Sequence, residues 1–104
     1  MTEVTTDRGW TFFTNHAHVL LCLSQNCNAR LRDVADRVGI TERAVHKIVS
    51  DLEQEGIVVR TREGRRNRYQ INTGMPLRHP MEAHCSVGQI IETILKPAKK
   101  KCTE

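Results

Sequence analysis

The stretch RLRDVADRVGITERAVHKIVSDLEQEGIVVRTREGRRNRYQIN, from Arg30 to Asn72, decides the fold. At its start, apolar residues recur at i, i+3, i+4 and i+7, which predicts one face of a short amphipathic helix. These residues are Leu31, Val34, Ala35 and Val38. Gly39 follows where a helix end favours a left-handed residue, and Thr41 is a suitable N-cap for another helix. The sequence therefore predicts two helices joined by a tight turn.

A longer helix and a hairpin are expected after the turn. The buried stripe of the helix is predicted from Val45, Ile48, Val49 and Leu52, and Gly56 ends it. The pattern then changes to the β-branched, partly alternating one that is typical of strands. Residues 57–62 and 68–72 are expected to pair around a turn at 63–64, giving a hairpin with an arginine-rich tip. Tyr69 and Ile71 are expected to anchor this hairpin to the core.

The flanking segments add two further helices. Thr14 is a candidate N-cap for a first helix, whose apolar stripe is predicted from Ala17, Leu20, Leu21 and Leu23. Asn26 and Asn28 suit a turn, and residues 28–30 are expected to pair as a minimal strand. The aromatic residues Trp10, Phe12 and Phe13 are expected to plug one end of the core. Near the other end of the chain, Ser86 is a candidate cap for a last helix.

Composition limits the classes of function. The chain has 104 residues, which fits one domain, and a net charge of +4, which favours an anionic partner without proving one. Aromatic residues make up 4% of the chain, too few for an aligned platform that stacks single-stranded bases. No apolar run approaches the roughly 20 residues of a membrane span, and the first residues do not form a secretory signal. We therefore expect a cytoplasmic protein without a membrane partner.

The order helix, helix, turn, helix, hairpin resembles the winged helix-turn-helix regulators of the MarR and ArsR kind. The resemblance is carried by DVADRVGIT for the first helix and turn, ERAVHKIVSDLEQEGIV for the recognition helix and REGRRNRYQIN for the wing. It implies an α+β, mostly α fold: a three-helix core with a β-hairpin wing, here with an added C-terminal helix. It also implies sequence-specific binding to double-stranded DNA and regulation of transcription.

Two sets of residues are the candidate DNA contacts. A major groove admits one α-helix, so the outward face of the recognition helix is expected to lie in it. The candidates on this helix are Thr41, Arg43, His46, Lys47 and Ser50. A hairpin that presents arginines suits the DNA backbone or a narrow minor groove. The candidates on the wing are Arg62, Arg65, Arg66, Asn67 and Arg68.

The expected organisation is a flexible N-terminus at 1–9, a DNA-binding domain at 10–73, a connector with a dimerisation helix at 74–97, and a basic flexible tail at 98–104. Regulators of the resembled kind usually dimerise through terminal helices, and two-fold operators follow from two-fold protein symmetry. We therefore expect a homodimer. The candidate dimer residues are Val87, Ile90, Ile91, Ile94 and Leu95. The alternative is that this helix packs on its own domain.

Catalytic, cofactor and metal sites are not expected. The chain has no nucleophile elbow, phosphate loop or HExxH motif. Some ArsR-like regulators sense metals through paired cysteines in the recognition helix, but residues 45–52 contain no cysteine. The remaining soft-ligand candidates are His16 with His18, and the group His79, Glu82, His84 and Cys85.

Two alternatives to this DNA-binding regulator remain open. One is a winged-helix module that binds another protein and not DNA, and the other is a repressor that responds to a metal or redox signal. The sequence identifies no small-molecule effector.

Overall fold

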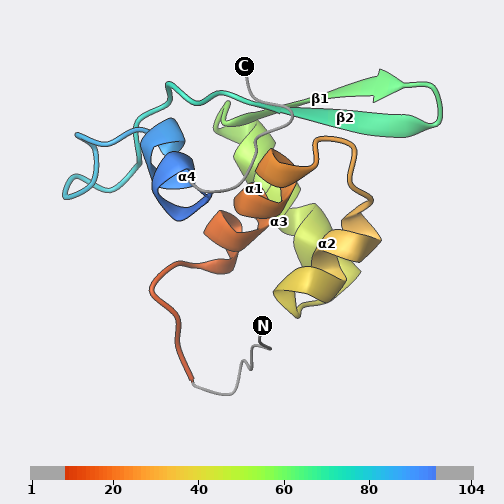
Figure 1. Cartoon of the computed structure of the whole chain (residues 1–104), viewed down its shortest axis with the longest axis horizontal. Helices are drawn as coiled ribbons and strands as arrows, with labels where there is room; N and C mark the ends of the chain where they lie inside the picture. The colour runs from red at the N-terminus through yellow and green to blue at the C-terminus, as the bar shows by residue number, and fades with distance from the viewer. Residues whose placement is uncertain (1–8, 96–104) are drawn as a thin grey trace.

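The computed structural model describes residues 9–95, so the expected flexible segments 1–9 and 98–104 lie outside the described residues, apart from Gly9. Within this range the chain forms six elements in the order helix, helix, helix, strand, strand, helix (Figure 1). They are α1 (Asn15–Gln25), α2 (Leu31–Val38), α3 (Glu42–Gln54), β1 (Val58–Glu63), β2 (Arg66–Ile71) and α4 (Val87–Leu95). The predicted fold class, a winged helix-turn-helix with an added helix, is confirmed.

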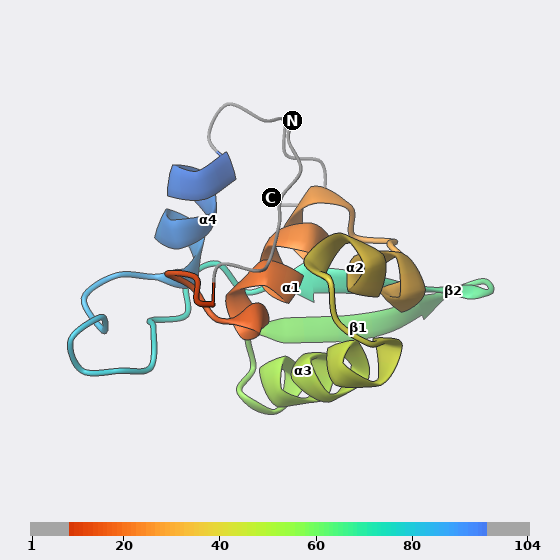
Figure 2. The ribbon, with the colours of Figure 1, turned by 90° about the horizontal axis from the view of Figure 1, so that it is seen from below.

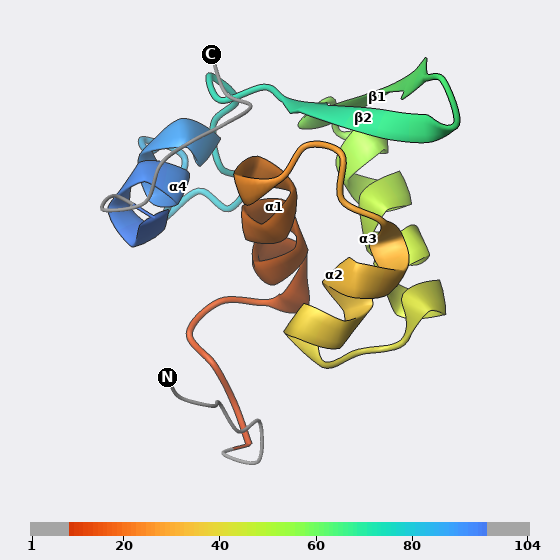
Figure 3. The ribbon, with the colours of Figure 1, turned by 45° about the vertical axis from the view of Figure 1, so that its right-hand side comes forward.

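The core forms where the apolar stripes of the first three helices meet the hairpin. Val19 and Leu23 of α1 and Val45 of α3 are completely buried, and Val34 of α2 is almost so. Helix α1 lies in the middle, between α4 on one side and α2 with α3 on the other (Figure 3). Removing such side chains from water is the main favourable term in folding a chain of this size.

The turn between α2 and α3 has the expected chemistry. Gly39 has φ 88°, a left-handed conformation that is strained for residues with a Cβ. Its N–H donates to the carbonyl of Ala35, which closes the last turn of α2. Thr41 then caps α3, because its hydroxyl oxygen accepts a hydrogen bond from the N–H of Ala44 at 3.0 Å. These bonds set the direction in which α3 leaves the turn.

The hairpin differs from the expectation at its tip. The strands pair from Val58 opposite Ile71 to Glu63 opposite Arg66, so the turn falls at 64–65, one residue later than predicted. Gly64, with φ 66°, supplies the left-handed residue that this turn uses. Tyr69 is buried and Ile71 half-buried, which confirms both as anchors.

The minimal strand expected at 28–30 does not form. The N–H of Tyr69 donates to the carbonyl of Cys27 at 2.8 Å, so the loop before α2 does lie beside β2. The pairing stops there because Arg30 is already the N-cap residue of α2, and the chain turns away from the hairpin.

One expectation at the start of the described chain is wrong and another is incomplete. Trp10, Phe12 and Phe13 do not plug the core: they are 73%, 88% and 41% exposed. The rings of Trp10 and Phe12 pack edge to face on each other. The chain before α1 leads away from the helices, which removes these rings from the core (Figure 1). The buried face of α1 also includes Val19 and Cys22, whereas Leu20 and Leu21 are only half-buried.

Helix α4 is tied to the domain by its N-terminal end. Ser86 and Gln89 form a reciprocal capping box, with the N–H of each residue bonded to the side chain of the other. The N–H of Gly88 donates to the carbonyl of Thr73, and Val87 is buried. Helix α4 and its connector lie at the end of the molecule opposite the hairpin tip (Figures 1 and 2). Across residues 9–95, every helix is too short or too polar to cross a membrane.

Candidate nucleic-acid interface

One face of α3 packs on the core and the other is open to solvent. Val45, Ile48, Val49 and Leu52 are buried, as predicted. The opposite face carries four exposed candidates, which are Arg43, His46, Lys47 and Ser50. Figure 2 shows α3 as the outermost element on its side, with its N-terminal end pointing the same way as the hairpin tip. The recognition-helix candidates and the wing therefore lie toward one end of the molecule.

Some polar side chains on this face already contact carboxylates of the same helix. The Lys47 ammonium lies 3.1 Å from one carboxylate oxygen of Asp51, and His16 of α1 lies 2.9 Å from the other. The hydrogen bonds from His16 and Lys47 hold the pKa of Asp51 below its usual value. His46 lies 3.5 Å from Glu42. Arg43 forms no side-chain hydrogen bond or ion pair with any residue between 9 and 95.

Thr41 has a structural role in addition to the expected one. Its hydroxyl oxygen accepts the capping bond from Ala44, so the side chain is fixed at the start of α3. The residue remains exposed, and the first backbone N–H groups of the helix lie beside it.

Some wing arginines form side-chain hydrogen bonds, whereas Arg65 forms none within the described residues. Arg62 donates to the carbonyl of Gly64 at 3.1 Å, and Arg66 donates to the carbonyl of Asn28 at 2.8 Å. Asn67 and Arg68 are half-buried, and the carbonyl of Asn67 accepts a hydrogen bond from the side chain of Asn28. Arg65 is exposed at the turn and has no side-chain partner within the described residues.

Sequence reasoning missed a contact that joins the wing to the recognition helix. Arg60 of β1 contacts Glu53 of α3 with two nitrogen–oxygen pairs, at 3.0 and 3.2 Å. This bidentate pair fixes the base of the hairpin relative to α3. The two residues are seven positions apart with a turn between them, and no sequence pattern distinguishes this pair from the other charges nearby.

The candidate dimer residues fall into two groups. Val87 and Ile91 are 2% and 3% exposed, so their side chains belong to the core of the chain itself. Their assignment to a dimer interface is revised for this reason. Ile94 is 38% exposed, and Ile90 and Leu95 are half-buried, so these three residues remain accessible to a partner.

Three of the soft-ligand candidates have ordinary partners. His16 is bonded to Asp51, His18 to Asn15, and the His79 ring accepts a hydrogen bond from the N–H of Met81. No three side chains of the metal-binding types come together within the described part of the chain. Burial raises the pKa of the Cys22 thiol, an effect that Arg37 partly opposes.

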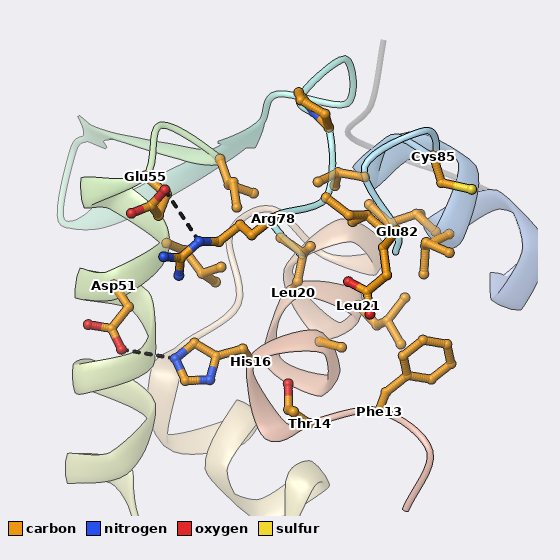
Figure 4. Close-up of a pocket in the computed structure, with 18 of the residues that line it drawn as sticks. Phe13, Thr14, His16, Leu20, Leu21, Asp51, Glu55, Arg78, Glu82 and Cys85 are labelled. Carbon is orange, nitrogen blue, oxygen red and sulfur yellow. Dashed lines mark hydrogen bonds and ion pairs between the residues drawn. The ribbon is translucent and has the colours of Figure 1, made fainter. Parts of the chain in front are cut away.

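A groove of about 630 Å³ lies on the side of the domain away from the wing. It is enclosed by α1, the C-terminal end of α3, the connector and α4 (Figure 4). Leu20, Leu21 and Ile90 are among its apolar walls, which explains why these side chains are only half-buried. Sequence reasoning did not assign this site, because its walls come from four separate segments.

Comparison with known proteins agrees with this architecture. Residues 14–59 match the family model described as winged helix-turn-helix DNA-binding. No curated protein matches the chain. Among solved structures, it is similar to the PcaV transcriptional regulator from Streptomyces coelicolor, which was crystallised in complex with its natural ligand. The TM-score is 0.53 at 22% identity, over 84% of this chain and 63% of PcaV.

The two matches cover different parts of the chain. The likeness to PcaV shows the fold, and this chain spans less than two thirds of that regulator. The matched family model covers α1, α2, α3 and the start of β1. The resemblance inferred from the sequence motifs is confirmed: the chain carries a winged helix-turn-helix domain of the DNA-binding kind.

Proposed function

We propose that this winged helix-turn-helix protein binds double-stranded DNA sequence-specifically as a homodimer and thereby regulates transcription. The observation that carries the proposal is the common direction of two basic elements. The exposed N-terminal half of α3, with Arg43 and Lys47, faces the same end of the molecule as the wing tip with Arg65.

Helix α3 is the element proposed for the major groove. Its buried stripe holds it against the core, while its exposed face presents long polar side chains at helical spacing. Arg43 is the side chain best placed to read a guanine edge, because no internal partner competes for it within the described residues. Thr41 and the nearby N–H groups at the helix start suit a backbone phosphate.

The wing is proposed to contact the DNA backbone or the minor groove. The bonds of Arg62 and Arg66 to backbone carbonyls stiffen the hairpin tip, and Arg65 projects from it. The pair between Arg60 and Glu53 keeps the wing in register with α3. A protein-binding wing has no need of clustered arginines, so this feature favours DNA over a protein partner.

The proposed dimer uses the exposed part of α4. Ile94, with Ile90 and Leu95 beside it, forms an apolar strip at the end opposite the wing. Residues 10–73 would then form the DNA-binding unit, with 74–97 as the connector and dimerisation helix. A symmetric pair would read two half-sites separated by about one helical turn, roughly 34–36 Å, or a multiple of it.

The test is fluorescence anisotropy with a random-sequence duplex at several salt concentrations. Affinity should fall steeply as salt rises, and Arg43→Ala and Arg65→Ala should each weaken binding. A variant that loses one phosphate contact should flatten the salt slope by about 0.9. Arg78→Ala is the matched control, because it removes the same charge from the connector, where Arg78 lies 3.7 Å from Glu55.

Two results would count against the proposal. One is an absence of duplex binding even at low salt, which would favour a protein-interaction module. The other is an equal loss of duplex affinity for Arg78→Ala and for the two test variants. That result would show that binding depends only on the net charge of the protein.

A further inference from the structure

The groove behind the DNA-binding face has the size and walls of a small-molecule site. Its volume of about 630 Å³ lies within the range of roughly 300–1,000 Å³ that is usual for ligand pockets. Leucine and isoleucine side chains from α1 and α4 form one wall, and Leu77 and Met81 of the connector form another. The aromatic ring of Phe13 stands at the edge (Figure 4).

The charges in the groove are unbalanced. Its lining includes the carboxylates of Asp51, Glu55 and Glu82 but only one guanidinium, that of Arg78. Two of the acids are already engaged: Asp51 with His16 at 2.9 Å, and Glu55 with Arg78 at 3.7 Å. Lys47 also pairs with Asp51, at 3.1 Å, and the lining includes the imidazoles of His16 and His84.

Glu82 is the carboxylate left over. Its side chain forms no hydrogen bond or ion pair with any residue from 9 to 95. Glu82 is an exposed residue that extends from the connector in Figure 4, and Phe13 lines the same groove. A negative charge, an aromatic ring and apolar walls in one groove are the combination that attracts an organic cation, through ion pairing and cation–π attraction.

We propose that this groove binds an organic cation with an apolar, ring-containing body. Glu82 pairs with the positive group, Phe13 supplies an aromatic face, and the apolar body occupies the space between α1 and α4. An anion of the same shape would meet the charge of Glu82 with no unpaired cation to offset it. The proposal does not depend on DNA binding, because Glu82 and Phe13 both lie outside α3.

Titration calorimetry with two ions of matched shape tests the proposal. Tetraphenylphosphonium and tetraphenylborate have similar bodies and opposite charges, so their difference reports the sign of charge that the groove prefers. The cation should bind at least about tenfold more tightly, equivalent to roughly 1.4 kcal/mol. Glu82→Gln should weaken cation binding several-fold and leave the anion unchanged or slightly improved.

A control variant and a location measurement accompany the calorimetry. Glu63→Gln removes one negative charge from the wing, away from the groove, and should leave cation affinity unchanged. Cys85 lines the groove, so the bound cation should slow the alkylation of this cysteine, followed by peptide mass spectrometry. Circular dichroism checks that Glu82→Gln remains folded.

Any of the following results would overturn the proposal. Equal affinity for both ions, or no effect of Glu82→Gln in a folded variant, would show that charge at Glu82 does not select the ligand. Cation binding without protection of Cys85 would place the ion elsewhere. The absence of binding by either ion would remove the groove as a ligand site.

Discussion

At the scale of single residues, Asp51 links the groove to the proposed DNA-binding face. One of its oxygens contacts His16, which also lines the groove, and the other contacts Lys47 on the exposed face of α3. Lys47 is 74% exposed, so the pair is well solvated and can be broken by a phosphate. In the proposed complex, Asp51 would therefore oppose DNA binding in two ways, by its negative charge and by its ion pair with Lys47.

The first prediction is that Asp51→Asn strengthens binding to a random-sequence duplex several-fold. The substitution removes a negative charge and releases Lys47, so the salt slope should steepen by up to about 0.9. Salt-dependent anisotropy measures both quantities. Glu92→Gln is the control, because it removes the same charge from an exposed position on α4. Weaker binding by Asp51→Asn would show that the carboxylate positions α3 and does not compete with DNA.

The second prediction concerns pH. The pKa of Asp51 is lowered from its ordinary value of 3.8, mainly by the bond from His16 and then by that from Lys47. A carboxyl whose folded-state pKa is depressed stabilises the fold above the unfolded pKa, and this contribution is lost as pH falls through the folded pKa. Urea unfolding above and below pH 3.8 should show a larger acid loss for the wild type than for Asp51→Asn. Equal losses would contradict the pairing.

At the scale of elements, the cap of α3 decides how firmly the recognition helix begins. The third prediction is that Thr41→Ala lowers the free energy of unfolding by about 0.5–2 kcal/mol, because the Ala44 N–H loses its acceptor. Urea denaturation measures this change. Thr41→Ser keeps the hydroxyl and should retain most of the stability. If serine and alanine cost the same, the cap does not contribute.

The docking of α4 depends on the absence of a side chain at Gly88. A Cβ at this position would lie 2.9 Å from both the carbonyl oxygen and the Cβ of Thr73. The fourth prediction is that Gly88→Ala destabilises the chain by about 1–3 kcal/mol, because α4 must shift away from Thr73. Gly74→Ala is the control, since its Cβ would meet its nearest neighbour at 3.8 Å. Thermal unfolding of both variants compares them.

At the scale of the whole molecule, the wing and α4 occupy opposite ends. This arrangement leaves α4 accessible to a second copy while the basic end faces the proposed DNA site. Two copies joined through α4 would therefore present two recognition helices, as a two-fold operator requires.

The fifth prediction tests this arrangement. Ile94→Glu places a charge in the remaining apolar strip of α4 and should shift the protein toward monomers in sedimentation experiments. Val59→Glu is the control, because Val59 is also an exposed apolar residue but lies on β1. The side chain of Val59 is 51% exposed, and that of Ile94 is 38% exposed. If Val59→Glu dissociates the protein and Ile94→Glu does not, the hairpin is the dimer contact.

The sequence alone determined the elements from Leu31 to Gln54 and the turn between them. Helical spacing, the left-handed glycine at position 39 and the cap at Thr41 depend on residues within a few positions of each other, so local patterns were sufficient. The hairpin was found for the same reason, with its turn misplaced by one residue. The outward face of α3 followed directly from its buried stripe.

Only the tertiary structure decided which of these side chains are available. His16 reaches Asp51 across 35 positions and Arg66 reaches Asn28 across 38, and no local pattern encodes such distant pairs. The exposure of Trp10 and Phe12, the burial of Val87 and Ile91, and the groove itself depend in the same way on how separate elements pack. Hydrophobicity indicates that a side chain favours burial, but the packing partners determine where, and whether, that burial occurs.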